Sequence, residues 1–320
     1  MGGFTNLDKV AAKEGLYVGA YGSEKLVVDE YGRMYINFDP GTHRFVDSVN
    51  GATSNGGLSW DDALASIDAA NNKCSVGDTI WVAPGHVETI TGTDITMDVA
   101  GVTVIGLGKG SRMPQIKHNH ANAEVSIAAD NVTWMNIRHS ADVTDVKVAI
   151  EIEDGVDYCK VKGCVFDVVA TATDEFLVSV RTNDASNFAT IEDNDFDMGL
   201  GAAVAAISFT KDTDGTVVRN NRAQGDYSTA NINGITTLST KLLIEGNLLV
   251  NGATGNIGTE PGIELVTGST GIIRDNDIMC NLATMIASIV ADACILYRNY
   301  YNEDLNPGTG AVMGTASAND

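Results

Sequence analysis

The sequence predicts an all-β fold, a parallel β-helix in which short strands wind into stacked coils. Three observations predict it. One phrase of aliphatic residue, charge, turn residue and asparagine recurs through the C-terminal half of the 320-residue chain. Between its recurrences lie runs rich in β-branched and small residues, bounded by Gly, Asp and Asn, as strands are. Between residues 79 and 301 no stretch has convincing helical periodicity.

The repeated phrase sets the length of one coil. Examples are ATIEDNDF at 189–196, LLIEGNLL at 242–249 and GIIRDNDI at 271–278. Aligned on its asparagine, the phrase recurs at intervals of 30, 27, 26, 29 and 23 residues, with a mean of 27, at Cys164, Asn194, Asn221, Asn247, Asn276 and Asn299. Periods of this size indicate a solenoid with two or three short strands per coil, in which each coil buries its core against its neighbours.

The runs between the phrases supply the other strands of each coil. In the C-terminal half they are 175–182, 202–210, 230–238, 261–268 and 285–292, and upstream the runs 77–85, 94–108, 124–139 and 147–155 have the same character. We therefore expect the β-helix to begin well before the first clear repeat.

Stacked coils place equivalent residues of the phrase in columns. Its aliphatic position is expected to point inward as one apolar column, Val161, Ile191, Val218, Ile244, Ile273 and Leu296. The next residue alternates in charge from coil to coil, as Lys162, Glu192, Arg219, Glu245 and Arg274. Opposite charges on adjacent strands contribute roughly 0.2–1 kcal/mol per pair, so we expect this register column mainly to fix the alignment of the coils.

The asparagines of the phrase are predicted to form a structural ladder, made of Asn194, Asn221, Asn247, Asn276 and Asn299. An asparagine at a bend tolerates unusual backbone angles and can bond to the backbone or to its copy in the next coil. We expect the ladder to stabilise the stack and not to bind a ligand.

The chain is expected to carry a small module at each end of the β-helix. Residues 1–44 are predicted to be an N-terminal attachment module, in which 25–38 forms two strands around the turn EYGR. The other interpretation of this segment is a strand pair that covers the end of the solenoid. Residues 305–320 are small and polar, and are predicted to be a flexible tail or an extended arm.

The β-helix itself is predicted to span residues 45–304, with one α-helix near 59–74 capping its open end. Ser59 is expected to cap this helix, with Asp62 completing an acidic variant of the capping box. Ala63, Ile67 and Ala70 would then fall on one buried face.

Composition excludes several classes of protein. Because 20 basic residues stand against 42 acidic ones, the net charge is −22 and no nucleic-acid partner is expected. The amino terminus lacks a basic segment followed by an apolar one, and no run of about 18 apolar residues occurs, so neither a signal peptide nor a membrane partner is expected. The five cysteines have no CxxC spacing, which predicts buried free thiols and neither zinc nor a disulfide framework.

Residues 45–90 carry a resemblance to a known class. The run FVDSVNGATSNGGLSWDDALASIDAANNKCSVGDTIWVAPGHVETI resembles the opening of right-handed parallel β-helix proteins of the pectate-lyase-like class. There a strand, a capping helix and a GDTI-hydrophobe-VAPG segment lead into the first coil. The resemblance covers roughly residues 45–304 and implies a right-handed parallel β-helix with one N-terminal capping α-helix and a small N-terminal β module.

The same resemblance implies a function. Members of the class are polysaccharide lyases and hydrolases, phage tailspikes, and virion proteins that decorate capsids as trimers. This chain is similar to the last group, which joins an N-terminal module to a short β-helix and a small tail. We therefore expect a non-catalytic bacteriophage capsid decoration (cement) protein on the capsid exterior, made in the host cytoplasm. Its partner would be the major capsid protein, its state a homotrimer, and it would need no cofactor.

The alternative is a tailspike-type receptor-binding protein or polysaccharide depolymerase. Such a protein needs exposed aromatic residues for stacking on sugars, and Trp60, Trp81 and Trp134 all fall in segments expected to be buried. The pectate-lyase arginine motif RxPxxR is absent. A glycosidase needs two carboxylates about 5–9 Å apart, for which the turns 193–195, 212–214 and 275–277 are candidates.

No catalytic residue, cofactor or metal is assigned from the sequence. The acidic residues in the turns are expected to cap loops, as such residues usually do. Asp212 and Asp214 are the candidates for a calcium ion, without the strict spacing of a calcium loop. His118 and His120 of the HNH sequence could meet symmetry mates on a trimer axis and bind a metal, but exposed loop histidines are the favoured interpretation.

Overall fold

The computed structural model divides the chain into two compact units, residues 1–42 and 43–320. It describes residues 42–93, 95–168, 174–199, 203–252, 260–280 and 288–302, and the strand backbones of residues 16–18, 26–28, 34–36 and 314–315. The first unit contains a three-stranded antiparallel sheet of β1 (Leu16–Val18), β2 (Leu26–Val28) and β3 (Met34–Ile36). The strands β2 and β3 pair as the run 25–38 predicts, whereas β1 was not predicted.

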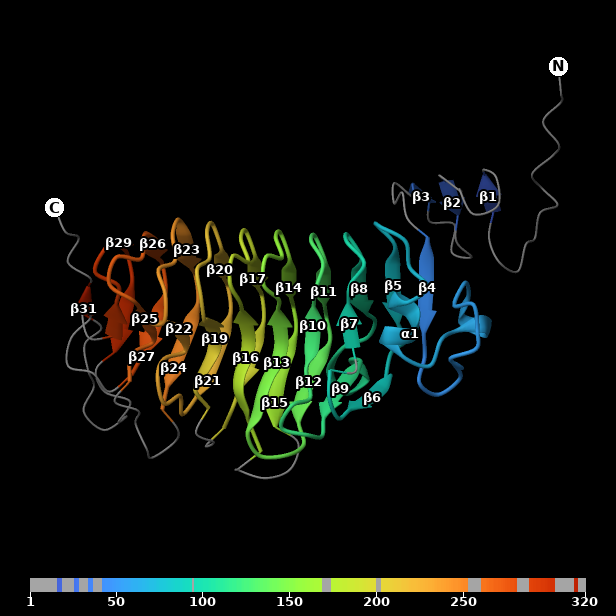
Figure 1. Cartoon of the computed structure of the whole chain (residues 1–320), viewed down its shortest axis with the longest axis horizontal. Coiled ribbons are helices and arrows are strands. Elements are labelled where there is room, and N and C mark those ends of the chain that lie inside the picture. Colours follow the sequence, from blue (N-terminus) through green and yellow to red (C-terminus); the bar gives the residue numbers. More distant parts are fainter. Residues whose placement is uncertain are drawn as a thin grey trace, which may run out of the picture. The chain divides into compact units, whose positions relative to one another are not determined.

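The second unit is a parallel β-helix, which confirms the predicted fold class. Three sheets run along it, and from β7 to β30 the strands pass through the three sheets in chain order (Figure 1). Sheet I has eight strands, namely β7 (Ile95–Met97), β10 (Val125–Ile127), β13 (Val146–Ile152), β16 (Phe176–Thr182), β19 (Ala205–Phe209), β22 (Ile232–Gly234), β25 (Ile263–Leu265) and β28 (Ile289–Val290).

The other two sheets have ten strands each. Sheet II contains β4 (His43–Val46), β5 (Thr79–Val82), β8 (Thr103–Gly106), β11 (Thr133–Met135), β14 (Lys160–Lys162), β17 (Thr190–Glu192), β20 (Val217–Arg219), β23 (Leu242–Glu245), β26 (Gly271–Arg274) and β29 (Cys294–Tyr297). Sheet III contains β6 (Val87–Ile90), β9 (Gln115–His118), β12 (Arg138–Ala141), β15 (Val165–Val168), β18 (Asp195–Asp197), β21 (Arg222–Gly225), β24 (Leu248–Asn251), β27 (Asp277–Met279), β30 (Tyr300–Asn302) and β31 (Gly314–Thr315).

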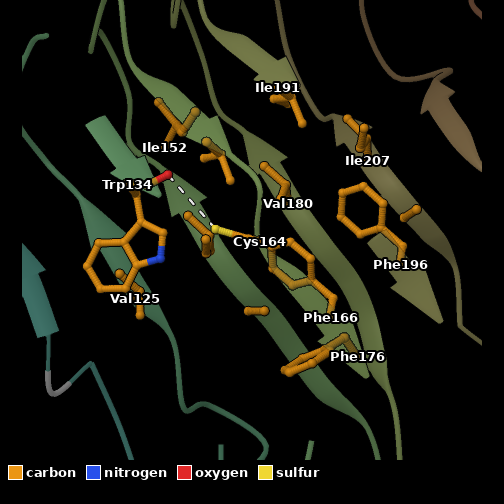
Figure 2. Close-up of a cluster of buried hydrophobic side chains, with 14 of the residues drawn as sticks. Val125, Trp134, Ile152, Cys164, Phe166, Phe176, Val180, Ile191, Phe196 and Ile207 are labelled. Carbon is orange, nitrogen blue, oxygen red and sulfur yellow. Dashed lines mark hydrogen bonds between the residues drawn. The ribbon is translucent and has the colours of Figure 1, made fainter. Parts of the chain in front are cut away.

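The core is the interior between the three sheets, and it is built of in-register columns. The predicted apolar column is present in sheet II, where Trp134, Val161, Ile191, Val218, Ile244, Ile273 and Leu296 are aligned in register and all but Leu296 are buried. In sheet III the rings of Phe166 and Phe196 stack with centroids 4.7 Å apart. Figure 2 shows these rings with Phe176 and the aliphatic residues of the facing strands. In the stacked coils, aliphatic side chains therefore pack against aliphatic ones, and aromatic rings against aromatic rings.

The prediction of one continuous helix over 59–74 is mostly wrong. The structure has a 3-10 turn η2 (Trp60–Asp62) and, after a break, the short helix α1 (Ile67–Asn71). Leu64 causes the break, because its backbone pairs with β4 as an isolated parallel bridge to Val46.

The predicted cap is wrong for the same reason. The Ser59 side chain makes no cap bond, Ser66 caps α1 by accepting from the Ala69 N–H, and Asp62 instead accepts from the Gly56 N–H. The residues predicted to share a buried face, Ala63, Ile67 and Ala70, are all buried. Within the described residues no helix is long and apolar enough to cross a membrane.

The C-terminal end of sheet III is closed by a change of direction. Strand β31 pairs antiparallel with β30, whereas every other pair along this sheet is parallel. The rest of the predicted tail, residues 305–320, lies outside the described residues.

Candidate functional site

The predicted asparagines lie in one buried stack at the turn between sheets II and III. Each side-chain oxygen accepts from the backbone N–H of the asparagine one coil earlier, at 3.0–3.2 Å. Each side-chain amide donates to a main-chain carbonyl of the preceding coil, at 2.8–3.1 Å. At its first end, Asn194 accepts from the Cys164 N–H. All these polar atoms bond within the stack, so the ladder offers no free group to a ligand.

One detail of the ladder differs from the expectation. The left-handed backbone belongs to the residue before each ladder position, with φ between 49° and 64° at Gly163, Asp193, Asn220, Gly246, Asp275 and Arg298. The ladder asparagines themselves do not have a positive φ. Their selection is therefore explained by side-chain hydrogen bonding and not by backbone tolerance.

The predicted register column is aligned strand by strand on the outer face of sheet II. The buried Glu192 carboxylate accepts from Lys162 Nζ at 2.9 Å and from Arg219 at 2.6 Å. Further along, Glu245 pairs with Arg274 at 2.6 Å. Burial raises the pKa of Glu192, but the hydrogen bonds from Lys162 and Arg219 together lower it below its usual value. These charges neutralise one another and hold the register.

Four of the turn carboxylates proposed for a glycosidase are bound by basic side chains. Asp195 pairs with Arg222, Asp214 with Lys241 and Asp275 with Arg298, each at 2.7 Å. Asp193 accepts from Lys162 at 3.2 Å. Asp212 and Asp214, the calcium candidates, do not belong to a cluster of potential metal ligands in the described part of the chain.

A cluster that the sequence did not reveal lies on the outer face of sheet I. The carboxylates of Glu124, Glu151 and Glu153 bring ligand oxygens within 4.8 Å of one another. Glu151 lies in strand β13 and Glu153 directly follows it, whereas Glu124 directly precedes β10, where Ser126 is in register with Glu151. The strands here pair residues that are 25 apart and not 27, the mean length of one coil, so the repeat gave no signal for this cluster.

Neighbouring side chains already occupy much of this glutamate cluster. Arg181 binds Glu151 through two bonds of 2.6 and 3.1 Å, and Asn183 also donates to Glu151. Ser126 donates to Glu153 at 2.6 Å, and Thr93 donates to Glu124 at 3.0 Å.

The pKa of Glu124 distinguishes the glutamate cluster from the paired acids elsewhere. Burial raises the pKa of Glu124, and the nearby Glu151 and Glu153 carboxylates raise it further against the Thr93 hydrogen bond. A carboxyl with a raised pKa is suited to act as a general acid, and three carboxylates can also hold a hard cation. These glutamates are therefore the best candidate for chemistry among the described residues.

The histidines of the HNH sequence are separated by the structure. His120 is exposed, but His118 is fully buried, so the expectation of exposed loop histidines is wrong for His118. Three hydrogen bonds form a chain. Trp134 Nε1 donates to His139 Nε2 at 2.9 Å, His139 Nδ1 lies 3.1 Å from His118 Nε2, and His118 Nδ1 lies 2.9 Å from the Ala123 carbonyl.

This relay is complete when both rings are neutral with the proton on Nδ1. Burial lowers the pKa of His118 to about 4, and burial followed by the neighbouring His118 lowers the pKa of His139 well below its usual value. Each ring nitrogen is thus used inside the core, and no lone pair remains for a metal.

The cysteines and tryptophans complete the comparison with the predictions. All five cysteines are free, and Cys159, Cys164 and Cys280 are buried as expected, whereas Cys74 and Cys294 are half-buried. Burial raises the pKa of Cys164 to about 12. Trp134 is buried and Trp81 partly so, but Trp60 is 41% exposed, which contradicts the expectation for this residue.

Comparisons with known proteins concern the fold. No family model matches the chain, and no curated protein matches it. Among solved structures, pectate lyase Pel9A is similar with a TM-score of 0.34 and 13% identity, over 80% of this chain and 79% of that one. The GH136 lacto-N-biosidase from Eubacterium ramulus is similar with a TM-score of 0.32 and 9% identity, over 80% of this chain and 68% of that one.

Proposed function

We propose that the protein is a non-catalytic structural protein of a bacteriophage particle, a homotrimeric decoration protein that binds the major capsid protein and stabilises the shell. One observation carries the proposal. The outer charges predicted as register or catalytic groups are neutralised by partners in adjacent coils, as at Glu192, Asp195 and Asp275. Such a solenoid is suited to act as a rigid body, and the N-terminal unit would supply a module for attachment.

The mechanism would be adhesion. A rigid body that contacts several capsid subunits makes opening the shell cost more, and threefold symmetry lets three weak contacts act together. The protein's net charge of −22 keeps free copies apart in solution, so assembly would depend on a specific contact.

The test is to measure the mass of the full chain by light scattering and then to sediment it with empty capsid shells. We expect a trimer that co-sediments in a fixed ratio to capsid subunits. A variant without residues 1–42 keeps β4 and the whole β-helix, and should lose co-sedimentation while remaining soluble. A full-length protein that ignores the shells would contradict the proposal.

A second candidate function rests on Glu124, Glu151 and Glu153. The raised pKa of Glu124 and the close spacing of the three carboxylates suit a tailspike-type depolymerase that cleaves a glycosidic bond. Oxygens within 4.8 Å are nearer to the roughly 5–5.5 Å of retaining glycosidases than to the roughly 6.5–9.5 Å of inverting ones. Against it, Arg181 and Asn183 hold Glu151 in place.

Polysaccharide cleavage separates the two candidates. We expect no release of reducing ends from host-surface polysaccharide by the wild-type protein. If cleavage occurs, Glu124→Gln and Glu153→Gln should each abolish it, whereas Glu264→Gln should not. Glu264 is a suitable control because it also lies on the outer face of sheet I and burial likewise raises its pKa.

A further inference from the structure

A pocket of about 590 Å³ lies near the first coils of the β-helix, away from the glutamate cluster. It is lined by Asp47, Asn50, Trp60, Asp61, Ala83, Pro84 and Arg112. These residues come from three separate excursions of the chain, which follow β4, β5 and β8. Its volume lies within the range of about 300–1,000 Å³ that is typical of small-molecule sites.

The backbone that forms this pocket is fixed. Asp47 accepts from the N–H groups of Val49 and Asn50 and from the Asn50 side chain, at 2.8, 3.4 and 2.9 Å. The Arg112 carbonyl accepts from the Gly85 N–H at 2.7 Å, which ties the η3 turn (Gly110–Arg112) to the turn after β5. Trp60 packs edge-on against Phe45, with ring centroids 4.7 Å apart. The walls of the pocket are thus largely preformed.

Three polar groups in the pocket have no hydrogen-bond or ion-pair partner among the described residues. Arg112 is the one arginine in the described ranges whose side chain is unpaired, because all the others donate to a carboxylate or a carbonyl, namely Arg44, Arg138, Arg181, Arg219, Arg222, Arg274 and Arg298. The indole N–H of Trp60 is unpaired, whereas those of Trp81 and Trp134 bond to histidines. The exposed Asp61 carboxylate is unpaired as well.

These groups define the chemistry of a ligand. An exposed indole face stacks on apolar surfaces, the guanidinium and indole N–H groups donate, and the Asp61 carboxylate accepts. A pyranose has an apolar face and hydroxyl groups that both donate and accept. Asp47 and Asp61 outnumber Arg112 in the pocket of a chain with a net charge of −22, so an anionic ligand would be repelled.

We propose that this pocket is a binding site for a neutral saccharide, with Trp60 stacking on one pyranose ring, Arg112 donating to its oxygens and Asp61 accepting from its hydroxyl groups. The site is independent of the proposed attachment to a capsid, and of the glutamate cluster. It would give a structural protein a weak affinity for surface glycans.

The test is to titrate the full-length protein with methyl glucoside, methyl galactoside, methyl mannoside and methyl N-acetylglucosaminide, using tryptophan fluorescence and calorimetry, with glucuronic acid as the anionic probe. We expect at least one neutral glycoside to bind in the millimolar range. Trp60→Ala should weaken binding about tenfold or more and Arg112→Ala severalfold. The Arg112 side chain has no described partner, so its variant should keep the fold.

Tyr158→Ala is the matched control, because Tyr158 is an exposed aromatic residue distant in the sequence, 57% accessible, that stacks on Phe188. It should leave the affinity unchanged. Three results would overturn the proposal. The first is that no neutral glycoside binds at about 50 mM. The second is that binding persists in both pocket variants, and the third is that glucuronic acid alone binds.

Discussion

The early and late coils of the β-helix fill the turn between sheets II and III with different side chains. At the turn between sheets II and III, the late coils carry the buried ladder that begins at Asn194, whereas Ile137 and Cys164 occupy the same position in the two preceding coils. The residue before this position is left-handed in both regions, as at Asn136 and Gly163. The backbone conformation of the turn is therefore the same in both regions, and only the buried side chain at this position differs.

The early coils place their buried polar groups in the core itself. The relay of Trp134, His139 and His118 occupies the interior of sheets II and III, where the late coils have Phe196 and aliphatic residues. The comparison teaches that a coil can satisfy buried polar groups through neutral amides, which do not titrate, or through imidazoles, which do. The two regions should then respond differently to mutation and to pH.

The largest effect is expected from Asn247→Ala in the late coils. It removes the acceptor for the Asn221 N–H and side-chain amide and the donor to the Val218 carbonyl, all of them buried. At about 1–3 kcal/mol for each stranded group, we expect a loss of about 4 kcal/mol in the free energy of unfolding. Urea denaturation measures it. The exposed neighbour variant Asn220→Gly should cost less than about 0.5 kcal/mol, and equal losses would refute a special role for the ladder.

A second effect, of about 3 kcal/mol, is expected from acid on the early coils. The unfolded chain protonates its histidines below pH 6.5, whereas folded His118 stays neutral down to about pH 4. Unfolding is thus favoured as the pH falls from 6.5 to 4, and stability is retained above 6.5. Hydrogen exchange at pH 5 should show β9–β13 losing protection before β20–β27.

The double variant His118→Met, His139→Phe tests the origin of this acid sensitivity. Its free energy of unfolding should change much less between pH 6.5 and 4 than that of the wild type, because the two buried imidazoles are gone. A wild-type stability that is flat across this window would contradict the relay of neutral histidines.

A smaller effect is expected from the register column. Glu192→Gln removes the charge that Lys162 and Arg219 share, and should cost about 1–2 kcal/mol, because Glu192 is buried. Glu245→Gln breaks one pair with the half-exposed Arg274 and should cost about 0.5 kcal/mol. Denaturation at low and high salt measures both, and equal costs would show that burial does not matter here.

The smallest effect is expected from Cys164→Asn, which would extend the ladder into the early coils. The Cys164 thiol already imitates an asparagine, since it lies 3.9 Å from the Trp134 carbonyl and against the Ile137 N–H. The asparagine amide could donate to both Trp134 and Asn194. We expect stability within about 1 kcal/mol of the wild type, measured by thermal unfolding, and a clearly larger loss would mean that the early coils require an apolar residue.

The sequence could predict the features that repeat. Because equivalent residues of stacked coils align in register, a phrase returning every 23–30 residues identified the apolar column, the ladder and the register column before any contact was known. The glutamate cluster escaped prediction because it depends on an offset between strands. Glu124 precedes β10, and only the pairing of Ser126 with Glu151 brings it near the other two.

Two further errors came from local pattern alone. Trp60 falls in a segment that was expected to be buried, but the helix predicted there is interrupted where Leu64 pairs with β4, and Trp60 is exposed. His118 seemed to belong to a loop, yet it is the last residue of β9 and faces the core. Tertiary pairing, which propensity does not contain, decided both cases.

The reversed strand β31 has a consequence for assembly. A stack of parallel coils with free ends could add further molecules end to end and grow into a fibre, as any sheet with exposed edges can. Here β31 occupies the last edge of sheet III, and the last strand of sheet I, β28, is only two residues long. Addition of further molecules through the C-terminal edge of sheet III is thereby discouraged.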